Sequence, residues 1–516
     1  MGMMFWLVLA PLIAAALILV LPKMGGPFYK FIAFVGSVVP LVMSLAAWVQ
    51  YSSSIGGFQF VSKLTWFTLP NLWQGKPLVI GLTFGVDGLS LPLLTLAAVV
   101  STVAVIAGKG SIARAKEYYF WITMVSAGLF GVFAALDLFT FLAALELSLF
   151  STFFLIYIFG EKGRQKAAFK FLIYRGFATV ALLVAFIVLA YAAVGGFAPT
   201  SAIAQGSAGT GSLTLNIPAL ITTTGQASTA IFPSAVRHTI FIMLLLAVFI
   251  EEAFVPFHTW LPTTHEHADT STNMLIGGIL TKTGAYVLLR FGVGMLPGEV
   301  RHYGVLIAVL GVINILYGGF AAWAQKDWRR LIAFGSISHM GLVLLGIAAL
   351  NTAGLQGAMF MLVSSGLLTA LLFFLTGSIK DRTHTAEIGQ LGGLSKRMPM
   401  LSGFLLVAAL GSLGLPLTSG FISEIQAFIG GFGTYPGISF VGVVGVILSA
   451  VYLLYAMQKT TFGPTAERYA ALADARPLEY VPIVILTGLV LLVGVYPDVI
   501  GHLFGLSAQA LLRIGG

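Results

Sequence analysis

The stretch HTIFIMLLLAVFIEEAFVPFHTW, residues 238–260, decides the class of protein to which this chain belongs. An unbroken apolar run, residues 240–250, leads into the adjacent carboxylates Glu251 and Glu252 and then into Pro256. A helix that is apolar on every side is buried in a large core or in a membrane. Proline interrupts a helix interior because it has no backbone N–H and clashes with the preceding turn. The stretch therefore predicts a membrane helix that breaks beside two acidic groups.

The composition of the whole chain supports the same class. Of its 516 residues, 58% are hydrophobic and 9% are charged, and the mean hydropathy is +0.98. Soluble domains carry about 25% charged residues, so an ordinary soluble enzyme is excluded. The chain has no cysteine, which excludes disulfides, cysteine-ligated iron–sulfur clusters and a thiolate nucleophile. The net charge of +9 comes from Lys and Arg in short loops between apolar runs, so we expect no nucleic-acid partner.

A helix needs about 20 mostly apolar residues to cross a bilayer. No positive residue precedes the apolar run in residues 1–22, so we expect a retained first span there rather than a cleaved signal peptide. The expected fold is an all-α polytopic membrane protein in which Pro256 and Pro416 break the seventh and twelfth helices. The stretches 52–87 and 196–236 are expected to be polar loops. The fourteen candidate spans are 3–22, 29–51, 88–108, 118–136, 138–160, 168–195, 238–261, 272–294, 303–324, 329–350, 353–378, 399–430, 437–457 and 478–503.

The distribution of positive charge predicts the orientation of these spans. With the N-terminus placed outside, 20 of the 27 Lys and Arg residues fall in inner loops or in the inner half of the sixth span. Such a bias is typical of the cytoplasmic side. We therefore expect an even number of spans, both termini on the outer, periplasmic side, and a place in a bacterial inner membrane.

The two broken helices also indicate an internal repeat, because they lie five spans apart. Two five-helix units would have opposite topologies, a design that recurs in transporters with sites near the membrane midplane. The expected organisation is three N-terminal helices with loops (1–117), a first five-helix repeat (118–295), a second repeat (303–457), and a last span with the C-terminus (458–516).

Several charged residues fall where a membrane helix should carry none. Lys282 comes thirteen residues after Asp269 and eight before Arg290, about 12 Å from the nearer end of its helix. Glu146 also lies near the middle of an apolar run. Glu251, Glu252 and Glu424 lie beside the two proline breaks, where freed backbone carbonyls and water make an ionisable group tolerable. An ionisable residue at mid-membrane depth is a candidate functional group because its burial is costly.

The remaining candidates have a plain structural alternative. His258 and His339 have the chemistry of proton carriers, although a buried histidine is often only a hydrogen-bonded core residue. Lys170 and Arg175 lie near the inner end of the sixth span and could be topology signals, although Lys170 could also reach a carboxylate of the fifth span. The run HEHAD, residues 265–269, matches no strong zinc pattern, and no cofactor-binding motif stands out, so we expect neither metal nor cofactor. The buried groups predict a translocator of protons or small cations.

At these residues the chain resembles the antiporter-like subunits of respiratory complex I, specifically chain M, the mitochondrial subunit 4. The resemblance is carried by VPFHTWLPTTH, GGILTKTGAYVLLRF, YGGFAAWAQKDWRRLIAFGSISHMG, AAFKFLIYRG and GLPLTSGFISE, in order over residues 118–460. It implies fourteen helices, two inverted five-helix repeats, and proton-path roles for Glu146, Lys282 and Glu424. It also implies partners: neighbouring antiporter-like subunits, small membrane subunits and lipids. Relatives of the chain L type carry a long lateral helix after the last span, whereas only about a dozen residues follow it in this chain.

One departure from the family pattern concerns the seventh helix. The resemblance implies a lysine five residues before the proline of the PFHTWLP-like motif, paired with the glutamate of the fifth helix. In this chain that position is Glu251, followed by Glu252. A histidine of the eleventh helix is likewise replaced by Ser365. From the sequence we hypothesise that Glu146 pairs with another cation, such as Lys170, and that Glu251 binds a proton or another ion.

The leading interpretation is a proton-translocating, non-redox subunit of a complex I-type NADH–quinone oxidoreductase. Three alternatives stay open: a subunit of a multi-subunit cation/proton antiporter, the membrane half of an energy-coupled inorganic-carbon uptake system, and a scaffold that no longer pumps.

Overall fold

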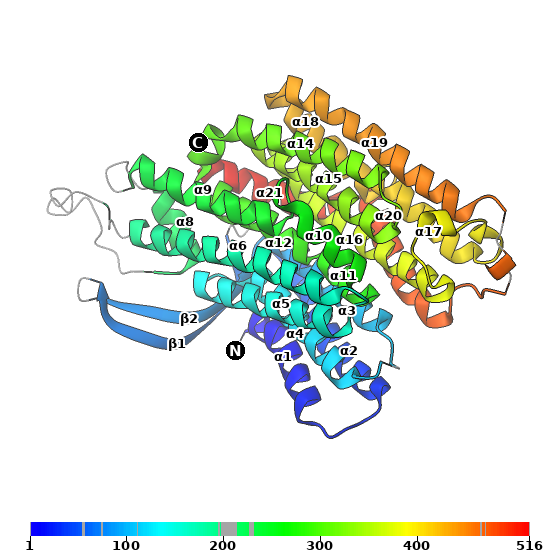
Figure 1. Cartoon of the computed structure of the whole chain (residues 1–516). Helices are drawn as coiled ribbons and strands as arrows, with labels where there is room; N and C mark the ends of the chain where they lie inside the picture. Colours follow the sequence, from blue (N-terminus) through cyan, green and yellow to red (C-terminus); the bar gives the residue numbers. More distant parts are fainter. Residues whose placement is uncertain are drawn as a thin grey trace.

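The structure is a computed structural model that describes residues 2–514 apart from 54–56, 74–75, 111, 194–196, 198–213, 227–231, 465–466 and 470. Helices form nearly all of it, and one pair of strands extends away from the helical body (Figure 1). Among the described residues, twelve helices are long and apolar enough to cross a membrane. The chain is an integral membrane protein, as its composition predicts.

The N-terminal part contains three helices and a hairpin. The prediction of a polar loop over residues 52–87 is wrong, because an antiparallel pair of strands occupies most of it. Alternating and β-branched side chains in this stretch favour pairing between strands. The elements are α1 (Met3–Val20), α2 (Gly26–Gln50), β1 (Gln59–Trp73), β2 (Lys76–Val86) and α3 (Ser90–Ala107).

The next part holds the first interrupted helix. Most of the predicted loop 196–236 lies outside the described residues, but it contains the short helix α8. The elements are α4 (Ala115–Ala134), α5 (Leu138–Phe159), α6 (Arg164–Ala193), α8 (Ile217–Gln226), α9 (Ser234–Glu251), η1 (Phe257–Thr259), α10 (Trp260–His267), α11 (Thr270–Gly278), η2 (Leu280–Lys282), α12 (Thr283–Val287) and η3 (Leu288–Val293).

The second half holds the other interrupted helix and the C-terminus. Its elements are α13 (Pro297–His302), α14 (Gly304–Trp323), α15 (Trp328–Ala348), α16 (Thr352–Thr383), η4 (Ile388–Gln390), η5 (Leu394–Lys396), α17 (Pro399–Ser412), α18 (Ser419–Thr434), α19 (Pro436–Thr461), η6 (Glu467–Tyr469), η7 (Pro477–Glu479), α20 (Tyr480–Val495) and α21 (Asp498–Ile514).

The predicted last span, 478–503, is wrong at its C-terminal end. The helix stops at Val495, and Pro497 precedes a separate helix, α21. One side of α21 is buried against α16, where the rings of Phe360 and Phe504 lie 5.3 Å apart. The count of fourteen spans and the inverted relation of the two five-helix units remain predictions.

The two helix breaks have the same backbone geometry. Each helix runs into a residue with φ near −90°, Glu252 at −84° and Leu413 at −91°. The next residue has positive φ, Ala253 at 58° and Gly414 at 77°. In both breaks the following amide donates to the carbonyl five residues earlier, with N···O distances of 2.8 and 3.0 Å. This hydrogen bonding closes a helix end and leaves the chain free to turn.

The helices differ in how far they are enclosed. The segment α11–η3, together with α15 and α16, is enclosed by the other helices, whereas α1, α2, α19 and α20 expose apolar faces. Exposed apolar faces suit contact with lipid or with neighbouring membrane helices. Lys282 and His339 lie on these enclosed helices. Arg175 and Glu251 lie on α6 and α9, which expose other faces but bury these two side chains.

Candidate functional site

Arg175 of α6 is the centre of a buried charged cluster. The residue is completely buried, and its guanidinium forms an ion pair with the Glu251 carboxylate of α9. Its Nη1 donates to the backbone oxygens of Glu251 and Leu280 at 3.3 and 3.5 Å. The Phe171 and Trp260 ring centroids each lie 5.8 Å from its Cζ, within the range of cation–π attraction. These contacts fix Arg175 between α6, α9 and η2.

The acidic pair Glu251 and Glu252 faces α12. Thr283 Oγ1 donates to Glu251 Oε2 at 3.4 Å, and the Ala285 amide donates to Glu252 Oε1 at 2.6 Å. Gly284 allows this approach, because a Cβ there would lie 2.8 Å from Glu252 Cγ. The other carboxylate oxygens, Glu251 Oε1 and Glu252 Oε2, are buried without a hydrogen-bond partner among the described residues. Each of these two oxygens is therefore available to a proton.

Glu146 of α5 joins the cluster from the opposite side. Its half-buried carboxylate interacts with the Thr179 hydroxyl and with the charge of Arg175. The expected partner Lys170 is engaged elsewhere, since its Nζ donates to the Thr259 oxygen at 2.7 Å and weakly to Thr263 Oγ1 at 3.4 Å. The hypothesis that Lys170 serves as the cation for Glu146 is wrong in this structure, because α6 directs Lys170 toward the start of α10. Arg175 takes that place.

Lys282 lies at an irregular point of its helix. It closes the 3₁₀ turn η2, and a π-helical segment, η3, follows shortly after it. Departures from α-geometry of this kind are frequent at functional sites. The side chain is fully buried, and Nζ donates to Thr281 Oγ1 at 3.2 Å. Its charge interacts with Glu252, so Lys282 continues the cluster toward the second half of the molecule.

His339 and Glu424 continue the row of ionisable groups. His339 on α15 interacts electrostatically with Lys282, and its Nε2 lies 3.0 Å from the Ser412 carbonyl oxygen at the second break. Glu424 on α18 lies beside Gly414 of the same break, where the absence of a Cβ leaves room for its carboxylate. Ser365 on α16 is buried, and its hydroxyl has no partner among the described residues.

His258 is not part of this row. Its ring packs against Tyr317, with centroids 4.8 Å apart, and it interacts with Lys170. His258 and Lys170 form a separate group beside η1 and α10. The structure thus links Glu146, Glu251, Glu252, Lys282 and His339 through Arg175 and their mutual interactions. It places Glu424 beside the second break, whose Ser412 carbonyl lies next to His339, and it leaves Lys170 and His258 apart.

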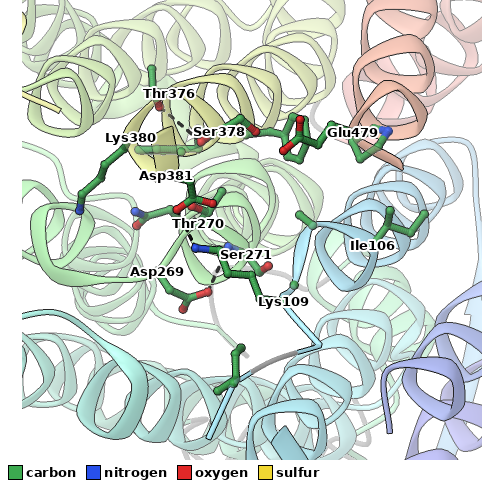
Figure 2. Close-up of a pocket in the computed structure, with 18 of the residues that line it drawn as sticks. Ile106, Lys109, Asp269, Thr270, Ser271, Thr376, Ser378, Lys380, Asp381 and Glu479 are labelled. Atoms are coloured by element: carbon green, nitrogen blue, oxygen red, sulfur yellow. Dashed lines mark hydrogen bonds and ion pairs between the residues drawn. The ribbon is translucent and has the colours of Figure 1, made fainter. Parts of the chain in front are cut away.

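A cavity of about 760 Å³ opens near the junction of α10 and α11, lined by the ends of several helices. Figure 2 shows Lys109 and Asp381 at this cavity, joined by an ion pair of 2.7 Å, with Asp269 and Ser271 alongside. Asp269 accepts hydrogen bonds from the Tyr118 hydroxyl at 2.6 Å and from the Ser271 amide at 3.2 Å. Burial raises the pKa of Asp269, and these hydrogen bonds together with those from Thr272 oppose the rise only in part. Sequence reasoning considered this carboxylate only as part of a rejected metal motif.

Arg175 is the functional candidate that sequence reasoning undervalued. Placing the sixth span at 168–195 put Arg175 near the inner surface, as a topology signal would be. The helix in fact begins at Arg164, so Arg175 lies about 16 Å along it. The sequence did contain one indication of this role. Glu251 is acidic where the family pattern has a lysine, and a buried carboxylate needs a positive charge nearby.

Comparisons with known proteins show what the chain is similar to in sequence and in fold. A family profile described as "NADH:quinone oxidoreductase/Mrp antiporter, TM" matches residues 135–450. The NAD(P)H-quinone oxidoreductase chain 4 1 of Synechococcus elongatus is 34% identical over 515 residues, covering 98% of this chain and 90% of that protein. A chain of respiratory complex I from Thermus thermophilus superposes with a TM-score of 0.83 at 25% identity, covering 99% of this chain and 100% of that chain.

A chain of the Mrp complex from a Dietzia species gives a TM-score of 0.81. It covers 100% of this chain and 99% of that chain at 19% identity, which shows the fold alone.

Proposed function

The chain belongs to the family of membrane subunits shared by NADH:quinone oxidoreductase and the Mrp antiporters, and we propose that it translocates protons within a complex I-type NADH–quinone oxidoreductase. In this proposal other subunits carry the redox reaction. The chain works beside neighbouring antiporter-like and small membrane subunits, in contact with lipid.

The observation that supports this proposal is the row of interior ionisable groups. The row runs from Glu146 through Glu251, Glu252, Lys282 and His339 to Glu424, across both interrupted helices. Chains of acidic, basic and imidazole groups inside a membrane are typical of proton relays. Lys170 and His258 are proposed as side groups that supply protons to the relay from the η1–α10 segment.

The proposed cycle moves protons in short steps between fixed groups. Lys282 lies between the acidic pair and His339, so it links the two halves of the relay. The helix breaks free backbone carbonyls such as that of Ser412, which can orient a side chain or a water molecule between two carriers. Redox events elsewhere in the assembly would shift these equilibria electrostatically and through movement of the broken helices.

We also propose the orientation of the chain. The positive-inside distribution supports both termini on the outer side, which in the proposed bacterial inner membrane is the periplasm. In that orientation the cavity of Figure 2 opens to the cytoplasm, which would supply water and protons to the α10–α11 junction.

Substitution of Lys282 tests the proposed function. Lys282→Ala in the intact assembly should abolish NADH-driven proton uptake into inverted membrane vesicles, because the central carrier is lost. Proton uptake is measured with a pH-sensitive dye and divided by the rate of quinone reduction. Lys396→Ala, at an exposed lysine outside the relay, is the matched control and should keep the wild-type ratio. Normal proton uptake in Lys282→Ala would reject the proposal.

A second candidate function is a subunit of a cation/proton antiporter of the Mrp type. The matching profile and the Mrp fold similarity support this candidate. The two functions differ in their driving force. Proton movement driven by an imposed Na⁺ gradient in vesicles without an electron donor would favour the antiporter.

A further inference from the structure

The buried cluster around Arg175 contains more acidic than basic groups. Its acidic members are Glu146, Glu251 and Glu252, and its basic members are Arg175 and Lys282. These groups come from α5, α6, the end of α9 and η2, and among the described residues they are the charged groups that interact with the acidic pair. With all five ionised, the cluster would carry one uncompensated negative charge. An isolated charge in a low-dielectric interior is very costly, so a further positive charge is required.

A bound proton can supply this positive charge, and the hydrogen bonds of the acidic pair indicate which oxygens can carry it. Glu251 Oε2 and Glu252 Oε1 already accept hydrogen bonds, from Thr283 and Ala285. Glu251 Oε1 and Glu252 Oε2 are the orphaned oxygens, and the two residues are 1% and 0% exposed. A carboxylic acid needs one oxygen to carry its proton and the other to accept. Each residue of the pair has one oxygen for each of these tasks.

Arg175 has the geometry of a fixed counter-charge. It contacts the backbone of α9 and η2 and lies against two aromatic rings, so its position does not depend on the ion pair alone. Arginine stays protonated under all physiological conditions. It can hold positive charge beside Glu146 and Glu251 without taking part in proton exchange itself.

Building on the proposed relay, we propose that Arg175 replaces the missing seventh-helix lysine as the cation of the first repeat, and that Glu251 and Glu252 together hold one transferable proton. The charge pattern of this half-site is inverted: the fixed charge is positive and lies on α6, and the exchangeable proton lies on α9. When Lys282 has passed its proton toward His339, the pair reloads it. The carboxyl O–H bond breaks as the ammonium N–H bond forms. The cluster then carries one excess negative charge beside the fixed charge of Arg175, which favours uptake of the next proton by the pair.

Charge exchange between α6 and α9 tests the inverted pattern. Arg175→Gln alone leaves three carboxylates with one cation, and Glu251→Lys alone places a second cation beside Arg175. Each single variant should lose proton uptake per quinone reduced. The double variant Arg175→Gln/Glu251→Lys has two acids and two cations and should regain it. A merely structural ion pair predicts no rescue, so a double variant that assembles normally but remains inactive would overturn the inference.

Infrared difference spectroscopy tests the stored proton without relying on activity. The wild-type assembly should show the carbonyl-stretch band of a protonated buried carboxyl. Glu251→Gln and Glu252→Gln should each remove or shift this band, whereas Glu424→Gln should leave it in place. The double charge-exchange variant should lack the band because its cluster is neutral without the proton. A band unaffected by both Glu251→Gln and Glu252→Gln would refute the stored proton.

The experiments distinguish a failure of the proposed function from a failure of the inverted half-site. If Lys282→Ala pumps normally, the proposed function itself fails. If Lys282→Ala is inactive but neither rescue nor the carboxyl band is found, only the inverted half-site fails.

Discussion

At the scale of single residues, an ion pair joins the strand hairpin to the Lys282 helix. Asp87 follows β2, and its carboxylate accepts two hydrogen bonds from Arg290 of η3 at 2.6 and 2.7 Å. Arg290 is also held by the Tyr286 hydroxyl. Burial alone would raise the pKa of Asp87, but the charge and hydrogen bonds of Arg290 outweigh it, and the pKa is lowered from 3.8. The ionised pair therefore stabilises the folded chain.

Asp87→Asn should destabilise the chain by about 3 to 5 kcal/mol, because it leaves the buried Arg290 charge without a partner. The loss is measured as a shift in thermal unfolding followed by tryptophan fluorescence. Since the folded-state pKa is lowered, the stabilisation is fully present above about pH 3.8 and is lost as the pH falls through the lower folded-state value. The difference between wild type and variant should be constant at neutral pH and shrink only in acid.

The exposed pair Lys109 and Asp381 provides the control for this substitution. Their side chains are 59% and 38% exposed, so Asp381→Asn should cost only about 0 to 1 kcal/mol. Equal losses from the two substitutions would contradict a specific role for the Asp87–Arg290 pair.

Residue-level prediction from sequence was uneven for a physical reason. Lys282 and Glu146 were identifiable because many apolar residues separate them from both ends of their spans. Arg175 was not, because basic side chains near a helix end extend to the surface and give the same sequence signal. Three-dimensional proximity to Glu251, 76 residues away in the chain, was needed to assign it.

At the scale of elements, the breaks at Glu252 and Leu413 share a backbone geometry but differ in the residue at positive φ. The first break uses Ala253 and the second uses Gly414. A residue with a Cβ pays about 1 to 2 kcal/mol in this region, whereas glycine does not. The two positions therefore form a matched pair for substitution.

Gly414→Ala should lower stability by about 1 to 2 kcal/mol and displace Glu424, because the new Cβ would lie 2.5 Å from Glu424 Oε2. Proton uptake per quinone reduced should fall with it. Ala253→Gly is the reciprocal control, and it should relieve strain and keep or raise the thermal midpoint. A Gly414→Ala chain with unchanged stability and pumping would show that the break tolerates a side chain.

Sequence patterns predicted the apolar elements well and the others poorly. A proline within an apolar run predicted that each of the two helices is broken. The hairpin was missed because its Ser, Thr and Gly content is typical of loops, and strand pairing is a non-local property. The division between α20 and α21 was missed because hydropathy does not separate a span from an amphipathic helix that directly follows it.

At the scale of the whole molecule, the proposed orientation can be tested by labelling, because the chain contains no cysteine. Ser234 at the start of α9 is exposed and belongs to the expected outer side, while Lys396 is exposed and belongs to the inner side. Ser234→Cys should react with a membrane-impermeant maleimide in intact cells, and Lys396→Cys only after the membrane is opened.

The cysteine-free parent chain is the control for background labelling. The reversed pattern would place both termini inside and would overturn the predicted topology. Labelling of both variants in intact cells would contradict a sealed inner loop at Lys396.

The global fold was the part most accessible from sequence. A bilayer requires long apolar helices, and short loops give the order of neighbours, so hydropathy and positive charge together constrain the architecture. The register between helices is not constrained in this way. It depends on close approaches such as that of Gly284 to the acidic pair, which hydropathy cannot detect.

The ion pair between Arg175 and Glu251 has a consequence for how this sequence can evolve. If the inverted half-site is functional, neither substitution is tolerated alone, and the two positions are bound by reciprocal epistasis. Among relatives, an acidic residue at position 251 should then occur together with a basic residue at position 175. Position 251 considered alone, with glutamate in place of the family's lysine, would suggest that the chain has lost its activity. Positions 175 and 251 considered together would show that the balance of charge is kept.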